Sequence, residues 1–464
     1  MRGEPVLTAA QMRAAEAALI ASGTSVDLLM QRAGHGAAEW VWRASGGRAV
    51  TVLCGPGNNG GDGWVIAEAI RARGGEVAVV MAGEPATDAA KTARGLYRGT
   101  VLSAKAAPSG EVLVDCLFGT GLTRPLSAEH LALLQRLAEQ HGKLAAVDLP
   151  SGIEADLGQP LGPDLPPCDL TIALGAWKFA HFLMPAAATM GALRLVDIGI
   201  GPIEGAAQAI GRPQFTAPGP QAHKYTRGLL GVVAGAMPGA ALLAAQAAQG
   251  AGAGYVRLYA EAPLAMPVDL VLITLPLTEA LADKRIAALL IGPGLGREEE
   301  ARAKLVLALS EQIPAVLDAD ALMLLSPHML AGRTAALVAT PHGGELAVLE
   351  RAFELPGSGT KLQRAAALAK ASGMVVVAKG ADSVVAAPDG RAALAHRASS
   401  WLSTAGTGDV LAGTIGSRLA TGADPFDAAC EGLWLHSEAA RHCGVPFTAG
   451  RLAEAVRAAY AACL

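Results

Sequence analysis

Short, continuous runs of apolar residues alternate with helical patterns along the whole chain. A strand of a parallel sheet covered by helices is apolar at nearly every position, because both of its faces are buried. The first half has such runs at residues 48–55, 76–83, 111–119, 143–152, 168–176 and 192–200. The second half has them at residues 228–236, 255–260, 269–276, 287–296, 313–322, 335–341, 374–380 and 383–394. The pattern predicts α/β structure with parallel sheets. The last two runs predict a hairpin, with a turn favoured at Asp389–Gly390.

One segment interrupts this alternation. Residues 201–228 are rich in Gly, Pro and Ala, which is typical of a linker between domains. We therefore predict two α/β domains, at residues 1–212 and 228–464, with a linker at residues 213–227. A chain of 464 residues is long enough for both.

Composition excludes several classes of function. The formal net charge is −4 and the basic residues form no stripe, so we expect no nucleic-acid partner. The apolar runs are too short to span a membrane, and the N-terminal segment "LTAAQMRAAEAALIASG" resembles an amphipathic helix more than a signal peptide. We therefore expect a cytoplasmic protein, with Ala-rich N-terminal helices that suit a homo-oligomer. The six cysteines form no CxxC pair, so neither a zinc site nor a disulfide framework is expected.

The first candidate site is the glycine-rich segment "GPGNNGGDG" at residues 55–63, between a strand and a helix. Its amides can approach an anionic ligand closely, although a tight turn would explain some of the glycines. The segments "DCLFGTGLTRP" (115–125), "DLPSG" (148–152) and "GAWKFAHF" (175–182) also follow predicted strands, at the edge where ligands bind. Asp115, Asp148 and Lys178 would converge there as an acid–base set. Each taken alone could be an ordinary loop charge or a helix cap.

The second candidate site is "STAGTGDVLAG" at residues 403–413. The amides near Gly406 and Gly408 can form an anion pocket at a helix start. Asp409 would repel a phosphate but could take a proton from a hydroxyl group that attacks phosphorus. The alternative is a helix cap. Supporting segments follow other strands: "GPGLG" (292–296), "LDAD" (317–320), "TPHGGE" (340–345) with His342 and Glu345, and "KGADS" (379–383). For His342, a cap and a ligand contact are both open.

In their order along the chain, "LTAAQMR", "GPGNNGGDG", "DCLFGTGLTR" and "VDLPSG" resemble the NAD(P)HX epimerase domain family, over about residues 5–212. The resemblance implies a Rossmann-like fold and interconversion of the R and S forms of hydrated NADH and NADPH. It also implies that Asp148 and Lys178 are catalytic, and that potassium is bound by Asn59, Asp115 and Ser151. The residues that it places on the cofactor are Asn58, Asn59, Gly60, Gly61, Asp62, Gly119, Thr120, Gly121, Leu122, Thr123, Arg124, Pro125 and Asp148. One departure is Trp177, which stands where the family has a proline before the lysine.

The second half, from about residue 222 to 464, resembles the ADP-dependent NAD(P)HX dehydratases of the ribokinase-like superfamily. The motifs are "GPGLG", "DADAL", "TPHGGEL", "KGADSVV" and "AGTGDVLAG". The resemblance implies transfer of the β-phosphoryl group of ADP to the C6 hydroxyl group of the S hydrate, with Asp409 as the base and Mg²⁺ present. Loss of phosphate would then restore NADH or NADPH. The implied binding residues are Ala240, Gly294, His342, Lys379, Gly380, Ala381, Asp382, Ser383, Gly408 and Asp409. "KGADS" departs from the family's "KGAGT" at Asp382.

Taken together, the two halves predict a bifunctional repair enzyme for NADHX and NADPHX, built from two three-layer αβα domains. Two alternatives stay open. A ribokinase-like kinase for a small alcohol would explain Asp409 but not the first half. A nucleotide sensor without turnover would bind the same ligands and lack both activities.

Overall fold

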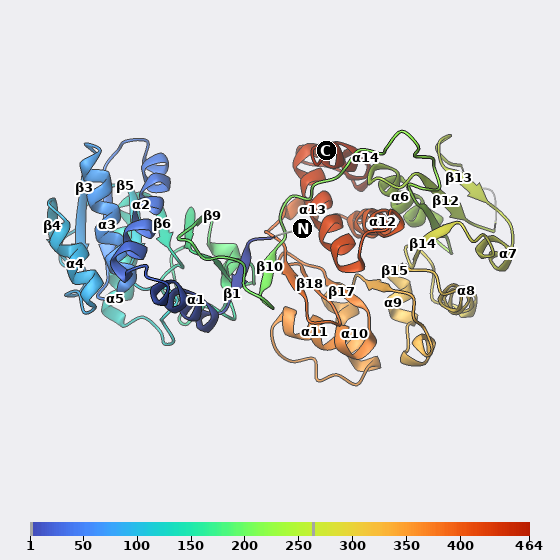
Figure 1. The fold of residues 1–464 in the computed structure, drawn as a ribbon, viewed down its shortest axis with the longest axis horizontal. Helices are drawn as coiled ribbons and strands as arrows, with labels where there is room; N and C mark the ends of the chain where they lie inside the picture. Colours follow the sequence, from blue (N-terminus) through green and yellow to red (C-terminus); the bar gives the residue numbers. More distant parts are fainter. Residues whose placement is uncertain (1–2, 262–264) are drawn as a thin grey trace. The chain divides into compact units, whose positions relative to one another are not determined.

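The computed structural model describes residues 3–261 and 265–464, which form two compact units (Figure 1). The N-terminal unit spans Glu4–Ala206, and the C-terminal unit contains Ala207–Leu464. The boundary between the units lies after Ala206, before the predicted boundary at residue 212. The reason is that β10 (Ala207–Ala209) pairs with β19 (Ala392–Leu394) of the C-terminal sheet. Residues 213–227 also pack within the C-terminal unit, where Phe215 stacks on Tyr460 with ring centroids 4.7 Å apart.

The N-terminal unit is built on a parallel sheet with the strand order β4-β3-β2-β5-β6-β7-β9. The strands are β2 (Val50–Cys54), β3 (Val77–Met81), β4 (Thr100–Ser103), β5 (Gly110–Cys116), β6 (His141–Val147), β7 (Leu170–Leu174) and β9 (Ala192–Val196). The helices are α1 (Ala9–Ala21), α2 (Val26–Ser45), α3 (Asn58–Ala72), α4 (Asp88–Leu96) and α5 (Ala128–Glu139). A short parallel pair, β1 (Pro5–Leu7) with β8 (Trp177–Lys178), lies outside this sheet order.

Successive residues of the central strands face opposite layers. In β2, Val52 belongs to the cluster that packs against α2 and α3, whereas Leu53 belongs to the cluster that packs against α5. In β5, Val114 and Leu113 divide in the same way. Because side chains alternate along a strand, a sheet covered on both faces needs apolar residues at every position. This burial explains the continuous apolar runs and confirms the predicted α/β layers.

The C-terminal unit has the strand order β13-β12-β11-β14-β15-β16-β17-β18-β19-β10. The remaining strands are β11 (Leu229–Val233), β12 (Tyr255–Tyr259), β13 (Val271–Ile273), β14 (Ile286–Ile291), β15 (Ala315–Leu317), β16 (Leu337–Ala339), β17 (Val375–Ala378) and β18 (Val384–Ala386). The helices are α6 (Pro238–Gly250), α7 (Leu277–Leu281), α8 (Glu299–Ser310), α9 (Asp320–Leu324), α10 (Gly343–Ala352), α11 (Lys361–Ser372), α12 (Thr407–Ala420), α13 (Pro425–Cys443) and α14 (Ala449–Ala461).

The pairing in this sheet changes direction at one edge. The pairs from β13 to β17 are parallel, and β18 is antiparallel to both β17 and β19. The predicted hairpin is therefore confirmed, and so is the turn at Asp389–Gly390, which divides residues 383–394 into two strands.

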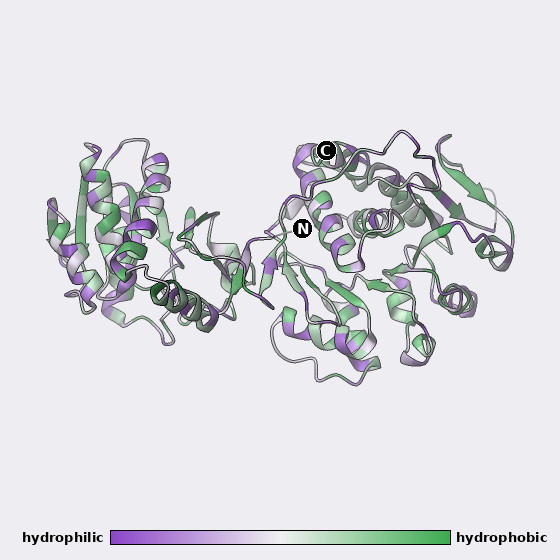
Figure 2. Ribbon diagram, viewed as in Figure 1, coloured by the Kyte–Doolittle hydropathy of each residue, from purple (hydrophilic) through white to green (hydrophobic). Residues whose placement is uncertain are grey.

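Hydropathy follows the layers of each unit. The strands are mostly hydrophobic along their length, whereas many helices carry one apolar and one polar side (Figure 2). In the C-terminal unit, Leu230 and Val232 of β11 share a buried cluster with α6, α12 and α13. Among residues 3–261 and 265–464, the structure has no helix with the length and apolar character that crossing a membrane requires.

Candidate active sites

A cavity of about 530 Å³ lies at the carboxyl ends of β2, β5 and β6 in the N-terminal unit. It brings together the loops that follow these strands and the lysine of β8. The predicted residues that line it are Asn58, Asn59, Asp62, Gly119, Thr120, Gly121, Leu122, Thr123, Arg124, Asp148 and Lys178. Sequence reasoning missed Met12, Arg13 and Glu16 of α1, and Thr87, which line it as well. Ligands of open parallel sheets bind at this edge.

Glycines allow the segment 55–63 to pack closely against neighbouring backbone. A Cβ atom on Gly55 would lie 1.9 Å from the carbonyl oxygen of Leu117, and one on Gly60 would lie 1.9 Å from that of Gly55. Gly61 packs against Met30, whose Cε would lie 2.4 Å from an added Cβ. The buried Gly60 and Gly61 therefore lie outside the cavity lining, and so does the exposed Pro125 of another loop. The helix α3 begins in this segment, and its N-terminus favours an anion.

Lys178 and Asp148 form a buried ion pair on the cavity wall. The Lys178 ammonium group contacts Asp148 Oδ1 and donates to the carbonyl oxygen of Leu174 at 2.7 Å. Asp148 has a left-handed backbone with φ 67°, a conformation that Asp and Asn tolerate better than most residues. Only 1% of the Lys178 side chain is exposed, so its charge depends on this partner.

His181 binds the backbone of both residues of this pair. Its Nδ1 accepts from the Lys178 amide at 2.9 Å, and its Nε2 lies 2.8 Å from the Asp148 carbonyl oxygen. Burial, with the nearby Lys178 charge, lowers the pKa of His181 to about 4. The neutral ring therefore donates from Nε2 and accepts at Nδ1. Trp177 packs edge-to-face on His181 with centroids 5.4 Å apart, and Lys178 still reaches the cavity.

Two further carboxyl groups face the Lys178–Asp148 pair. Burial, with the Asp148 and Glu16 charges, raises the pKa of Asp62 well above its usual range. Burial and the Asp148 charge also raise the pKa of Glu16, against the opposing effect of Lys178 and Arg13. The cavity therefore holds carboxyl groups that favour the protonated form beside one buried ammonium group.

Of the predicted potassium ligands, Asn59 lines this cavity, whereas Asp115 and Ser151 are buried outside its lining. Asp115 is 1% exposed and accepts from the amides of Leu117 at 3.0 Å and Ser151 at 2.9 Å. The Ser151 hydroxyl group donates to Asp115 Oδ1 at 2.7 Å. Burial raises the pKa of Asp115, although these hydrogen bonds act in the opposite direction. Within the described residues, Asn59 Oδ1 and Nδ2 are buried without a hydrogen-bond partner. An unpartnered amide oxygen, a carboxylate and a hydroxyl group are the kinds of oxygen ligand that suit a hard cation.

In the C-terminal unit, Lys379 joins carboxylates from several strand ends. Its Nζ donates to Asp318 Oδ1 at 2.6 Å and lies 3.8 Å from Glu345 Oε2. Thr340 donates to the same Asp318 oxygen at 2.7 Å. Burial alone would lower the pKa of Lys379, but the Asp318 and Glu345 charges raise it overall. The sequence resemblance implies that Lys379 is a binding residue, but it does not indicate this contact with Asp318.

Asp409 lies in the first turn of α12, close to this network. The helix begins after Gly406, which has a left-handed backbone with φ 90° and no side chain to cap the helix. A Cβ on Gly408 would lie 3.6 Å from Lys379 Nζ. Burial and the Asp318 charge raise the pKa of Asp409 to about 6, although Lys379 acts in the opposite direction. A carboxylate with this pKa is suited to accept a proton near neutral pH.

His342 caps a helix in this structure. Its Nδ1 accepts from the amides of Gly344 at 3.0 Å and Glu345 at 3.3 Å at the start of α10. Glu345 Oε2 accepts in return from the His342 amide at 2.8 Å. The helix cap, which the sequence left as one of two alternatives for His342, is therefore present. The imidazole is 61% exposed, so a ligand contact through Nε2 stays a prediction.

The segment "KGADS" forms a tight turn after β17. The Ser383 hydroxyl group accepts from the Gly380 amide at 3.1 Å, and Ala381 is exposed. Asp382 is buried and forms an ion pair with Lys361, the first residue of α11. Lys361 also closely approaches Gly380, since its Nζ would lie 2.3 Å from an added Cβ there. Asp382, where the sequence departs from the family motif, is thus paired with the Lys361 ammonium group, which the sequence did not indicate.

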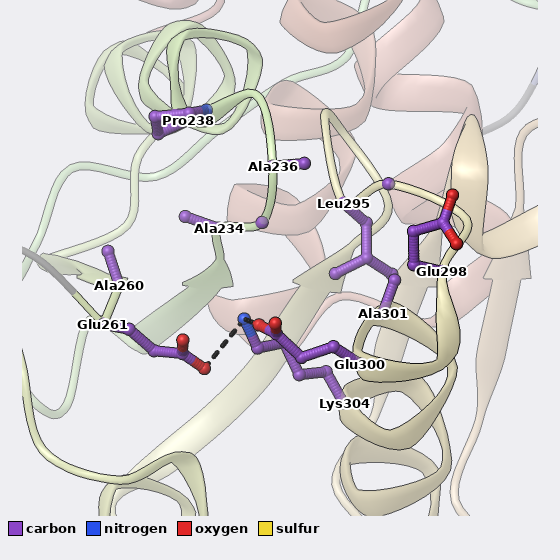
Figure 3. A pocket seen from close by; sticks show the side chains of 12 residues that line it. Ala234, Ala236, Pro238, Ala260, Glu261, Leu295, Glu298, Glu300, Ala301 and Lys304 are labelled. Atoms are coloured by element: carbon purple, nitrogen blue, oxygen red, sulfur yellow. Dashed lines mark hydrogen bonds and ion pairs between the residues drawn. The ribbon is translucent and has the colours of Figure 1, made fainter.

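A second recess, of about 320 Å³, lies at the carboxyl ends of β11, β12 and β14 (Figure 3). Ala234, Ala236 and Leu295 line one part of it, and Lys304 lies between Glu261 and Glu300. Gly294 and Ala240 lie beside this recess: a Cβ on Gly294 would lie 3.1 Å from that of Ala240. The Gly296 amide donates to Asp320 Oδ2 at 3.0 Å, which links the recess wall to the carboxylates near Asp409.

Comparisons with known proteins agree with the two units. A family model described as NAD(P)H-hydrate dehydratase matches residues 230–458, and one described as YjeF-related protein N-terminus matches residues 26–180. Among solved structures, the ADP/ATP-dependent NAD(P)H-hydrate dehydratase from Bacillus subtilis, co-crystallized with ATP/Mg²⁺, is 27% identical. The match covers 55% of this chain and 100% of the Bacillus subtilis chain, with a TM-score of 0.48.

Curated relatives extend over both units. The bifunctional NAD(P)H-hydrate repair enzyme Nnr of Mycobacterium tuberculosis (strain CDC 1551 / Oshkosh) is 36% identical over 436 residues, which cover 90% of this chain and 89% of that protein. The enzyme of the same name from Mycobacterium leprae (strain TN) is 33% identical and covers 98% of each chain. With both candidate sites inside the matched length, the chain belongs to the family of bifunctional NAD(P)H-hydrate repair enzymes.

Proposed function

We propose that this protein repairs hydrated nicotinamide cofactors with two activities. The N-terminal unit interconverts the R and S forms of NADHX and NADPHX. The C-terminal unit dehydrates the S form in a reaction driven by ADP. One observation carries the proposal: the same chain holds a buried Lys178–Asp148 pair in a ligand-sized cavity and a raised-pKa Asp409 at an uncapped helix start. Family membership supports the same assignment.

In the dehydratase, Asp409 takes the proton of the C6 hydroxyl group as its oxygen attacks the β-phosphorus of ADP. The bond from that phosphorus to the bridging oxygen breaks, and AMP leaves. The C6–O bond then breaks with its electron pair on phosphate, and loss of a C5 proton restores the reduced ring. The amides at the start of α12 and the Lys379 ammonium group would stabilise the phosphoryl charge.

Magnesium would reach this site with the nucleotide. Among the residues described, no group of three or more His, Cys, Asp or Glu side chains is arranged to hold a metal ion. Asp318 is already engaged by Lys379 and Thr340, and Asp320 by Gly296 and Arg297. Mg²⁺ is commonly held by substrate phosphates together with few protein ligands, where it offsets their charge.

The pKa of Asp409 predicts how dehydration depends on pH. The base must be ionised, and the pKa is raised to about 6. We expect kcat/KM for the S hydrate to be constant at neutral pH and to fall about tenfold per unit below about pH 6. Initial rates with saturating ADP between about pH 5 and about pH 8 would measure this limb. A constant rate across that range would contradict the assignment of Asp409 as the base.

We infer that potassium binds at Asn59, Asp115 and Ser151 in the N-terminal unit. The buried, unpartnered Asn59 oxygen supports this site. When bound, the ion would supply a positive charge beside the buried Asp115 carboxylate. We expect Asp115→Ala to raise the potassium concentration for half-maximal epimerisation by about 10–100-fold.

The exposed Asp88, in the first turn of α4, provides the control variant Asp88→Ala. Circular dichroism of Asp115→Ala would check folding, because the amides of Leu117 and Ser151 lose their acceptor. Epimerisation by folded Asp115→Ala with an unchanged response to potassium would exclude this site. Dehydration of the S form should be unaffected in both variants.

One assay tests the whole proposal. Protein is mixed with equal amounts of the R and S hydrates of NADH, with ADP and Mg²⁺, and the near-ultraviolet absorbance of NADH is followed. Full recovery requires both activities. Recovery that stops near half would contradict the epimerase assignment alone. A stable phosphorylated product without NADH would instead favour a small-molecule kinase.

A further inference from the structure

The N-terminal cavity carries a further acid, Glu16, on a different element from the Lys178–Asp148 pair. Glu16 comes from α1, whereas Asp148 and Lys178 come from the far end of the unit's sequence. All three line the same cavity. A group on a separate element matters because inversion of a carbon centre needs proton transfer on both of its faces.

Several contacts hold α1 over the cavity. Thr8 and Gln11 form a capping box, and the Ala9 amide donates to Asp156 Oδ1 at 2.7 Å. Met12 packs into the space left by Gly175, where its Cε would lie 2.7 Å from an added Cβ. Glu16 follows Met12 by one helical turn, so it lies on the same face of α1. Gly175 is in the loop that leads to Lys178, so this contact fixes α1 against the segment that carries Lys178.

We infer that Glu16 is a catalytic acid–base residue of the epimerase, acting on the face of C6 opposite to the Lys178–Asp148 pair. This inference rests on the proposed function. In one direction the Glu16 carboxyl group donates its proton to the C6 hydroxyl group. The C6–O bond breaks with its electron pair on the departing water, and the N1 lone pair forms a C6=N1 bond. A water molecule then adds to the other face and gives a proton to Asp148. No electrons are gained or lost overall.

The surroundings of Glu16 favour the required proton. It faces Arg13 from its own helix, Asp62 from α3, Asp148 after β6, Lys178 of β8 and Arg124 of the loop after β5. Burial and the Asp148 charge raise its pKa, so the protonated form persists to a higher pH than for an exposed glutamate. In the reverse direction the same group, ionised, takes the proton from the incoming water.

The test is Glu16→Gln, which keeps the shape of the side chain and removes the acid. We expect kcat for epimerisation to fall about 10²–10³-fold, with KM for the hydrate within about threefold. Glu16→Asp should recover part of the rate, because it restores an acid in the cavity. The ionisation contributed by Glu16 should disappear from the pH profile of the Gln variant.

The control is Glu129→Gln, an exposed residue in the first turn of α5 that should keep the wild-type rate. Dehydration of the S form should be unchanged in every variant. A wild-type rate or an unaltered pH profile for Glu16→Gln would overturn the inference. A wild-type protein that does not interconvert the hydrates would instead overturn the proposed function itself.

Discussion

Asp409→Asn should stop dehydration of the S hydrate while the R and S forms continue to interconvert. The amide cannot accept the hydroxyl proton, so we expect kcat/KM to fall about 10²–10⁴-fold. Binding should persist, because the amides at the start of α12 and Lys379 are unchanged. The measurement is NADH recovery from the pure S form with ADP, beside epimerisation followed by chromatography of the two hydrates.

Stability gives an independent check on the same variant. The Asp409 carboxylate lies near Asp318, and its raised pKa means that the folded state disfavours the charge at neutral pH. Removing the charge should therefore leave Tm unchanged or raise it, because residues at functional sites often lower the stability of the folded state. The control Asp427→Asn also removes an acid from the first turn of a helix, α13, and should dehydrate normally. Dehydration by Asp409→Asn at the wild-type rate would exclude Asp409 as the base.

The strands could be predicted from the sequence because burial on both faces leaves a local signature. Val52 and Leu53 face different layers, yet both must be apolar, and the pattern is visible in a few consecutive residues. The edge strands were harder to predict. Residues 383–394 form one apolar run, and although the turn at Asp389–Gly390 was predicted, the separate strands β18 and β19 on either side of it were not. The pairing of β10 with β19 depends on contacts between segments that are distant in the sequence, so no local pattern predicts it.

The site residues divide in the same way. Asp148 and Lys178 could be anticipated because they follow β6 and β7 at the ligand edge, and topology brings such positions together. Glu16 could not, because it lies on an amphipathic helix and reaches the cavity only through the packing of α1. The cap made by His342 was one of two open alternatives, since local spacing permits it without excluding a ligand. The ion pair of Lys361 with Asp382 joins α11 to the turn after β17. Nothing in the sequence of either segment indicates that the two lie together.

Asp148→Asn should abolish epimerisation and leave dehydration of the S form intact. Asn has nearly the same shape and tolerates the left-handed backbone at φ 67°, so the loop should keep its conformation. The buried Lys178 ammonium group loses its charged partner, so an unpaired charge would be left inside the unit. Both changes remove the acid–base pair from the cavity. We expect kcat for epimerisation to fall about 10²–10⁴-fold.

The mixed-hydrate assay shows the consequence directly. With Asp148→Asn, NADH should recover rapidly to about half of the pool, because only the S form is consumed, and then only at the slow uncatalysed rate. The matched control is Asp164→Asn, an exposed residue that also has a left-handed backbone, with φ 57°, and should allow full recovery. Full recovery by Asp148→Asn would show that the buried pair is structural. Half recovery there, with normal dehydration of pure S hydrate, would place the epimerase chemistry at Asp148 and separate it from Asp409.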